Sequence, residues 1–290
     1  MPLFKRHKVL LGAILKAPRC PTRMELMKWL FLLKQETSLD SDPTFYDFVP
    51  YKYGPFSFTV YRDLDELSRF GFFADEELRI RPSLLSDANR EFLSLPNAIR
   101  SAISSILTQY GCISLRRLID SIYDRYPWFA SRSESKKIQS SSKRPRKFAA
   151  FTAGYEGKSI DAFLQKLMAA GIERIIDVRN NPISRKYGFS KEVLNRLSSR
   201  VDIEYVHIPD LGVPPSFRRS LDTFDDYLDL MSYYESSILP SVPSFRRRAA
   251  RLLKERPSVL VCFEADSNYC HRARLAKVLS SDTGLEVVHL

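Results

Sequence analysis

Residues 259–275, VLVCFEADSNYCHRARL, change abruptly from apolar to polar and then take on helical spacing. The apolar and β-branched residues 259–263 are typical of a strand buried on both faces. A polar turn follows over 264–268, and Cys270-His271-Arg272 then begins a pattern with one apolar helical face. Open α/β sheets build their sites from these parts, outside the carboxyl ends of the strands, so Glu264 is predicted to stand at such an edge. The candidate N-caps of the helix are Asp266, Ser267 and Asn268.

The C-terminal half alternates between strand-like and helix-like segments. Strands are predicted over 148–153, 174–178, 205–208, 259–263 and 286–290, and helices over 159–170, 190–197, 222–237, 243–255 and the segment that begins near 271. Strands separated by helices indicate a mostly parallel, Rossmann-like α/β sheet with right-handed connections. We therefore predict an α/β domain over 148–290.

Polar side chains follow four of these predicted strands. They are Tyr155, Glu156, Asp177, Arg179, Asn180, His207 and Glu264. The carboxyl ends of parallel strands lie along one edge of a sheet, so these groups are expected to meet there. Four strands that deliver polar groups to one edge predict a shared site.

Four segments of this half also resemble, in the correct order, the motifs of a bacterial family called domain of unknown function 488. They are AGYEGKSIDAFLQKL, IIDVRNNPISRKYGFS, EYVHIPDLG and VCFEADSNYCHRARLA. The resemblance spans the C-terminal half, from Phe148 to Leu290. It implies a Rossmann-like domain with a polar pocket, and it leaves the reaction open.

Two carboxylates at one edge suit cleavage of a glycosidic bond, where one group stabilises an oxocarbenium-like centre or positions water. We assign the catalytic roles to Asp177 and Glu264. The N-terminal segment 1–130 and the basic linker 131–147 are predicted to bind DNA. The natural substrate is then the N-glycosidic bond of a damaged or modified base, which indicates a DNA glycosylase acting in repair or in defence against foreign DNA. The residues assigned to substrate binding are Tyr155, Glu156, Arg179, Asn180, Ser184, Arg185, His207, Cys270, His271 and Arg272.

Several residues have a second interpretation. Asp177 could only form a salt bridge with Arg179 or Arg272, and Tyr155 could only pack the sheet edge. Cys270, near a helix N-terminus, has the position of a nucleophile, although a small buried hydrophobe is the commoner role.

Other classes of chemistry also stay open. Cys270, His271 and His207 have the right atoms for a metal site but no recognised ligand spacing, so we assign no metal ligand and no cofactor. The alternative functions are a nuclease, in which Asp177, Glu264 and Glu156 hold Mg²⁺, and a non-catalytic nucleotide sensor that regulates DNA. No dinucleotide or P-loop fingerprint occurs in the sequence.

The N-terminal segment 1–130 is predicted to be a smaller, mainly helical domain. Helices over 4–16, after Thr22 and after Ser57, followed by a hairpin of Phe72-Phe73 with 78–80, have the order of a winged helix-turn-helix with a helical extension. The candidate DNA contacts on its third helix and wing are Arg62, Arg69, Arg79 and Arg81. Recognition of a protein partner and a purely structural role are the alternatives for this module.

Length and charge complete the organisation. A chain of 290 residues exceeds the size, about 250 residues, at which single cores usually stop growing, so we expect two domains. The basic linker 131–147 between them carries seven basic side chains and one acidic one, and therefore supplies +6 of the net charge of +11. A basic linker of this kind can bind the phosphates of a nucleic acid, and its affinity for them falls as the salt concentration rises. The linker residues assigned to DNA are Lys143, Arg144, Arg146 and Lys147.

The remaining features indicate the compartment. No apolar run approaches the about 20 residues of a membrane helix, and no convincing signal-peptide cleavage site follows the basic N-terminus. The four cysteines have no paired CxxC spacing. We therefore expect free thiols in a cytoplasmic protein that binds DNA and no membrane.

Overall fold

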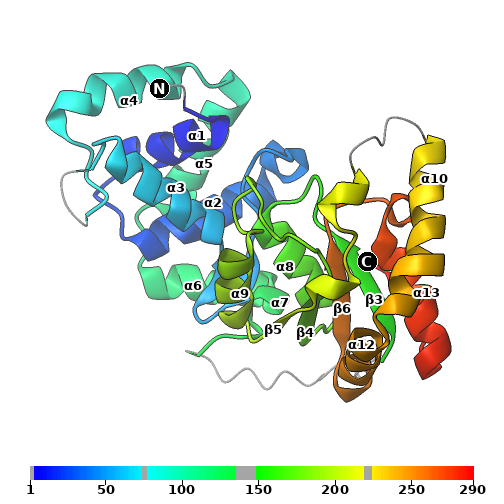
Figure 1. Cartoon of the computed structure of the whole chain (residues 1–290). Helices are drawn as coiled ribbons and strands as arrows, with labels where there is room; N and C mark the ends of the chain where they lie inside the picture. Colours follow the sequence, from blue (N-terminus) through cyan, green and yellow to red (C-terminus); the bar gives the residue numbers. More distant parts are fainter. Residues whose placement is uncertain (1–2, 74–76, 135–147, 219–223) are drawn as a thin grey trace. The chain divides into compact units, whose positions relative to one another are not determined.

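The structure, a computed structural model, describes residues 3–73, 77–134, 148–218 and 224–290 (Figure 1). It contains two compact units, Met1–Ser140 and Ser141–Leu290. The linker residues Lys143, Arg144, Arg146 and Lys147 lie outside the described residues, as does most of the predicted linker 131–147.

The described part of the first unit is mainly helical. Its elements are α1 (Lys5–Leu15), α2 (Arg23–Glu36), β1 (Val49–Tyr51), β2 (Gly54–Phe56), α3 (Phe58–Arg69), α4 (Leu85–Leu93), α5 (Asn97–Tyr110), α6 (Leu115–Arg125) and α7 (Pro127–Ala130). The predicted caps are confirmed for two helices. Thr22 and Glu25 form a reciprocal capping box at α2, and the Ser57 hydroxyl accepts from the Val60 N–H at α3.

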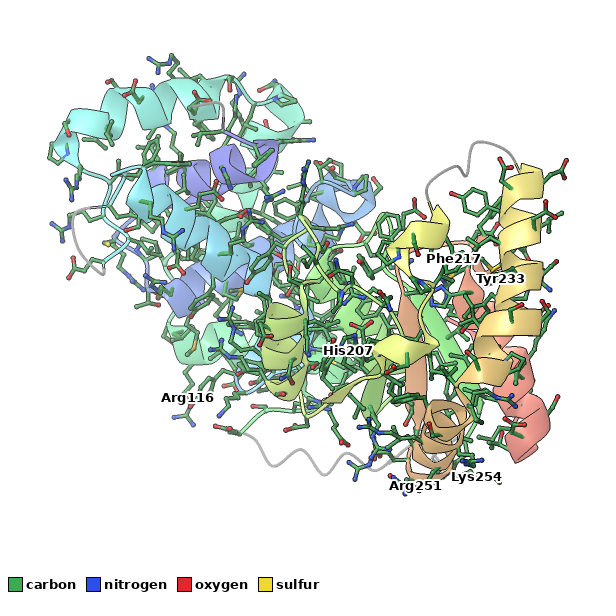
Figure 2. All side chains as sticks on the ribbon, in the orientation of Figure 1. Arg116, His207, Phe217, Tyr233, Arg251 and Lys254 are labelled. Carbon is green, nitrogen blue, oxygen red and sulfur yellow. The ribbon has the colours of Figure 1, made fainter. Side chains whose placement is uncertain are left out.

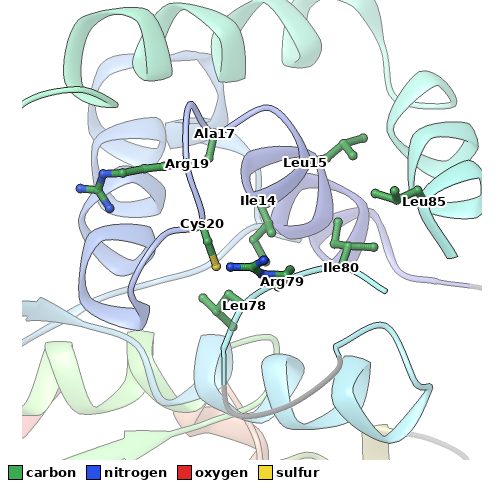
Figure 3. A pocket seen from close by; sticks show the side chains of 9 residues that line it. All are labelled: Ile14, Leu15, Ala17, Arg19, Cys20, Leu78, Arg79, Ile80 and Leu85. Carbon is green, nitrogen blue, oxygen red and sulfur yellow. The ribbon is translucent and has the colours of Figure 1, made fainter. Parts of the chain in front are cut away.

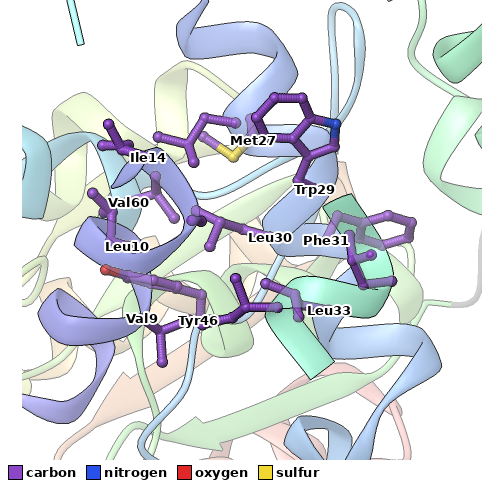
Figure 4. Close-up of a cluster of buried hydrophobic side chains, with 14 of the residues drawn as sticks. Val9, Leu10, Ile14, Met27, Trp29, Leu30, Phe31, Leu33, Tyr46 and Val60 are labelled. Carbon is purple, nitrogen blue, oxygen red and sulfur yellow. The ribbon is translucent and has the colours of Figure 1, made fainter. Parts of the chain in front are cut away.

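The core of this unit surrounds α2. Every residue from Glu25 to Leu33 is buried, so this helix is enclosed on all sides by its neighbours. Figure 4 shows Leu30 of α2 among apolar side chains from α1, with Trp29 and Phe31 on either side of it in the sequence. The fully enclosed helix explains why its apolar residues follow no single amphipathic stripe.

A hairpin between α2 and α3 departs from the predicted order of elements. β1 and β2 pair antiparallel, with Val49 opposite Phe56, where the sequence analysis expected no strands. Both strands are three residues long and contain a proline, so they show no alternation to detect. Of the predicted hairpin after α3, the residues that the structure describes show one antiparallel bridge, between Phe73 and Ile80.

The second unit is an α/β domain, as predicted. Its strands β3 (Ala150–Gly154), β4 (Arg174–Asp177), β5 (Glu204–His207), β6 (Ser258–Cys262) and β7 (Val287–His289) form one parallel sheet in the order β5-β4-β6-β3-β7. Its helices are α8 (Ile160–Ala169), α9 (Lys191–Ser199), α10 (Phe224–Tyr233), α11 (Leu239–Ser241), α12 (Pro243–Glu255) and α13 (His271–Thr283). Helices flank the sheet (Figure 1). Apolar side chains of α10, α12 and α13 share one buried cluster with Ile176 and Leu260 of the strands.

The register aligns the carboxyl ends of four strands. Gly154 lies opposite Cys262, Asp177 lies opposite Val261, and Asp177 also lies opposite His207. Because β6 sits between β4 and β3, the segment that follows Cys262 emerges among the other strand ends. The sheet therefore provides the common edge that the sequence predicts.

The predicted N-cap of the last helix of this unit differs from the structure. Asp266 accepts from the Asn268 N–H and closes a short 3-10 turn over Ser267–Tyr269, so α13 begins later, with Cys270 at its N-cap. The prediction that a residue of 266–268 caps this helix is wrong because Asp266 caps the 3-10 turn that precedes the helix, and residues 267 and 268 lie within that turn. Ser190 precedes α9, but its hydroxyl donates to a loop carbonyl and does not cap the helix.

Among the described helices, none combines the length and the apolar character needed to cross a membrane. All four cysteines are free thiols, as predicted.

Candidate functional site

A buried group, which we call the arginine cluster, surrounds Arg179 at the end of β4. Its members are Tyr155, Asp177, Arg179 and Tyr205. The Arg179 Nε donates to Asp177 Oδ1 at 2.8 Å and its Nη2 donates to Oδ2 at 2.5 Å, a two-pronged pair. Its Nη1 donates to the Tyr155 hydroxyl at 2.8 Å, and Tyr205 donates to Asp177 Oδ2 at 2.6 Å. All of these contacts lie on or beside the strand ends.

The electrostatics of this cluster follow from burial and pairing. Asp177 is fully buried and Arg179 is 5 % exposed. Burial lowers the pKa of Arg179, but the hydrogen bond and charge of Asp177 outweigh it and raise that pKa. Burial, and then the charge of Asp177, raise the pKa of Tyr205. Asp177 thus forms the salt bridge with Arg179 that was the alternative interpretation of its role, and two neighbours, Arg179 and Tyr205, engage its oxygens.

Tyr155 packs the sheet edge. Its ring stacks on Phe189, with centroids 4.1 Å apart and planes 8° from parallel, and it is 3 % exposed. A face already covered by Phe189 is not available to a nucleobase. Phe263, 44 % exposed and next to Glu264, is an aromatic side chain that this edge does present, and Tyr269, 41 % exposed, is another. Phe263 continues the apolar run of β6, so the pattern predicted a buried strand residue at this position. In the structure the strand ends at Cys262, and Phe263 lies just beyond it.

A second group, which we call the thiol cluster, lies where β6 meets α13. It consists of Cys262, Cys270 and His271, all buried, with the half-buried Glu264 beside them. The His271 Nδ1 lies 3.7 Å from Cys262 Sγ and 4.0 Å from Cys270 Sγ. The Cys270 thiol donates to Glu264 Oε2 at 2.8 Å. Cys262 was not among the predicted site residues. Its position two residues before Glu264, at the end of a predicted strand, was the feature of the sequence that could have indicated it.

The thiol cluster shifts the acidity of its members. Burial, and then the charge of Cys262, raise the pKa of Glu264. The hydrogen bond from Cys270 lowers the pKa of Cys262 against the effect of burial, and His271 lowers it further. Burial raises the pKa of Cys270. Glu264 is therefore a carboxyl group that keeps its proton to higher pH than an exposed one.

Arg272 holds the loop that carries Glu264. Its guanidinium is 1 % exposed and donates to the Glu264 and Ala265 carbonyl oxygens at 2.5 and 3.1 Å. The two terminal nitrogens of Arg272 are thus directed at the loop, and its Nε is buried without a hydrogen-bond partner among the described residues, which argues against the predicted phosphate contact. Glu156 holds the same loop from the other side, where its Oε2 accepts from the Ala265 N–H at 2.9 Å.

Gly154 allows this loop to approach β3. A Cβ at Gly154 would stand 1.8 Å from the Glu264 carbonyl oxygen, a backbone atom that cannot rotate away. We expect Gly154→Ala to lower the free energy of unfolding by about 3 kcal/mol, the upper range for overpacking. The control Gly157→Ala, at φ +73° with no atom within 4 Å, should cost about 1 kcal/mol. Urea unfolding followed by far-UV circular dichroism compares the two, and an equal cost would contradict the expected clash.

The other predicted edge residues take separate positions. His207, labelled in Figure 2, donates from Nε2 to the Arg179 carbonyl oxygen at 2.9 Å. It thus faces the arginine cluster. The metal site considered for Cys270, His271 and His207 is therefore wrong in including His207. Asn180 donates to the Pro209 carbonyl oxygen at 3.2 Å. Ser184 lies half-buried in the loop before α9, and Arg185 is exposed.

The candidate DNA contacts of the first unit differ in their surroundings. Arg62 and Arg79 lie 3.7 and 3.6 Å from Glu66 and Glu77, and Arg81 donates to the Phe73 carbonyl oxygen. Arg69 is exposed at the end of α3. Arg79 also lines a pocket of about 400 Å³, shown in Figure 3, together with Ile14, Leu15, Ala17, Arg19, Cys20, Leu78, Ile80 and Leu85.

The comparisons with known proteins concern the second unit. Residues 159–279 match the model of the family described as Domain of unknown function DUF488, which confirms the resemblance of the C-terminal half. The matched range includes Asp177, Arg179 and the whole thiol cluster, whereas Tyr155 and Glu156 precede it. No curated protein and no solved structure matches the chain.

Proposed function

We propose that this protein is a DNA-acting hydrolase, a glycosylase that cleaves the N-glycosidic bond of a damaged or modified base. The observation that carries the proposal is Glu264, a half-buried carboxyl group of raised pKa at the strand-end edge. A carboxyl group that keeps its proton can donate it to a leaving group, as general acids of glycosidic cleavage do. The exposed ring of Phe263 offers a stacking surface for an extruded base next to this acid.

The proposed reaction is a hydrolysis with Glu264 as the proton carrier. The bond between C1′ and the base nitrogen breaks, its electron pair leaves with the base, and the Glu264 proton is transferred to that base. Water forms the new bond to C1′ and returns one proton to the Glu264 carboxylate. Asp177 acts in this scheme as a positioning group that holds Arg179 and Tyr205, because those two partners engage its oxygens.

DNA as the substrate is supported by the first unit and by charge. We propose that the mainly helical first unit is a winged helix-turn-helix whose arginines on α3 and after it contact phosphates. The linker 131–147 adds +6 within 17 residues, a charge that attracts a polyanion. The nuclease alternative has less support, since a Mg²⁺ ligand role for Asp177 competes with its pair to Arg179.

Product analysis tests the proposal. The full-length protein is incubated with unmodified, damaged and phage-modified DNA, and the products are analysed by mass spectrometry and by strand integrity before and after alkali. A glycosylase should release free base and leave alkali-labile sites in intact strands. Direct strand cleavage that needs added Mg²⁺ would instead indicate the nuclease, and DNA binding without any product would indicate a non-catalytic sensor.

A further inference from the structure

The thiol cluster has the ligand set of a metal centre. The donor atoms of Cys262, Cys270 and His271 all lie within 4.8 Å of one another. Zinc bonds of ordinary length, about 2.3 Å to sulfur and 2.0–2.1 Å to nitrogen, place tetrahedral ligands about 3.5–3.8 Å apart. The distances from His271 Nδ1 to the two sulfurs, 3.7 and 4.0 Å, are close to this separation. A small contraction would bring three ligands onto one ion.

The imidazole is already oriented for that role. The His271 Nε2 lies 3.2 Å from the Val178 carbonyl oxygen, which can only accept, so Nε2 carries the proton. In neutral imidazole the lone pair is then on Nδ1, the nitrogen that faces both thiols. A metal-bound histidine commonly donates its other N–H to a carbonyl or carboxylate in this way. The tautomer that a metal requires is therefore set by the end of β4.

The N-terminus of α13 favours a thiolate at Cys270. Cys270 is the N-cap of α13, a helix of 13 residues, and the positive end of its dipole stabilises a negative sulfur. Glu264 Oε2 lies 2.8 Å from Cys270 Sγ, so a carboxyl group stands next to one of the three ligands. Two soft sulfurs and one imidazole select zinc-like ions, whereas Mg²⁺ and Ca²⁺ require oxygen ligands.

We propose that Cys262 Sγ, Cys270 Sγ and His271 Nδ1 bind one Zn²⁺ ion, with Glu264 adjacent to its fourth position. Binding converts both thiols to thiolates and releases their two protons to solvent, while the neutral His271 releases none. Three protein ligands with one further position correspond to the catalytic class of zinc site, in which Glu264 would stand next to a bound water. Zinc binding does not depend on the proposed base release, so either proposal can fail alone.

Metal content and cobalt spectra test the site. The full-length protein, purified with a phosphine reductant, should contain about one zinc per chain, measured by inductively coupled plasma mass spectrometry. After removal of zinc, added Co²⁺ should produce thiolate-to-cobalt charge-transfer bands and the intense visible bands of a tetrahedral ion. The double variant Cys262→Ser/Cys270→Ser should lose both signals.

The matched control is Cys20→Ser/Cys112→Ser, which removes the two exposed thiols of the first unit and should keep zinc and both sets of bands. In this background a thiol reagent should modify the two remaining cysteines faster without zinc than with it, a measurement that needs no variant of the site itself. The proposal is overturned if the reduced protein shows neither zinc nor cobalt–thiolate bands, or if Cys262→Ser/Cys270→Ser binds the metal as the unaltered protein does.

Discussion

Replacing Glu264 by Gln is expected to reduce the rate of base release by about 10²- to 10⁴-fold, the usual contribution of a general acid. Gln has nearly the same shape and can still accept from the Cys270 thiol, but it cannot transfer a proton to the departing base. The rate is measured under single-turnover conditions on the DNA that yields the most free base. Circular dichroism establishes that the variant is folded.

The pH dependence provides a second, independent measure of the same role. Burial and the neighbouring Cys262 raise the pKa of Glu264, so its acid form persists to higher pH than that of an exposed glutamate. Activity should therefore be present below this raised pKa and be lost as pH rises through it. The Gln variant should show no such fall. The control Glu192→Gln, which removes an exposed carboxylate at the start of α9, should behave as the unaltered protein. A rate for Glu264→Gln within a few-fold of the original would remove Glu264 from the mechanism.

Replacing Asp177 by Ala is expected to lower the free energy of unfolding of the second unit by about 3–5 kcal/mol. The reason is the buried guanidinium of Arg179, which would lose its two-pronged partner and remain as an uncompensated charge. Tyr205 would lose its acceptor as well. The control is Asp282→Ala, which breaks the exposed pair with Arg246 and should cost about 0–1 kcal/mol.

Two optical signals separate the units in this measurement. Both tryptophans, Trp29 and Trp128, belong to the first unit, so their fluorescence follows its unfolding, while far-UV circular dichroism follows both units. Asp177→Ala should move the unfolding of the second unit, seen by dichroism alone, to lower denaturant concentration. The transition of the first unit, seen by fluorescence, should stay where it is. A cost no larger than that of Asp282→Ala would mean that Arg179 finds other partners, and that Asp177 is free to act on a substrate.

The two carboxylates illustrate what sequence patterns can and cannot predict about a site. Both stand at strand ends, and the alternation of strands and helices was sufficient to place them on one edge. Their different chemistry depends on contacts made by residues two to six positions away, Arg179 and Cys270, whose side chains turn toward them. Strand periodicity places a backbone in the sheet, but it does not determine which way a side chain points after the strand has ended.

In the first unit, prediction from sequence was limited to elements with local hydrogen bonds. The capping box at Thr22 was predictable because its hydrogen bonds join residues three apart in sequence. The β1–β2 hairpin was not predictable, because strands of three residues with prolines at positions 50 and 55 carry no alternating pattern. Contacts with α7 and α2, distant in sequence, accompany this hairpin.

The segment 259–275 combines both kinds of information. Its residues alone determined a buried strand, a polar turn and a helix, because each depends on local spacing and hydrogen bonding. Only the tertiary structure decided that Cys262, taken from sequence as a strand residue, lies with Cys270 and His271 in one cluster. The physical reason is that β6 is inserted between β4 and β3, so that the Val178 carbonyl oxygen orients His271 across the edge of the sheet.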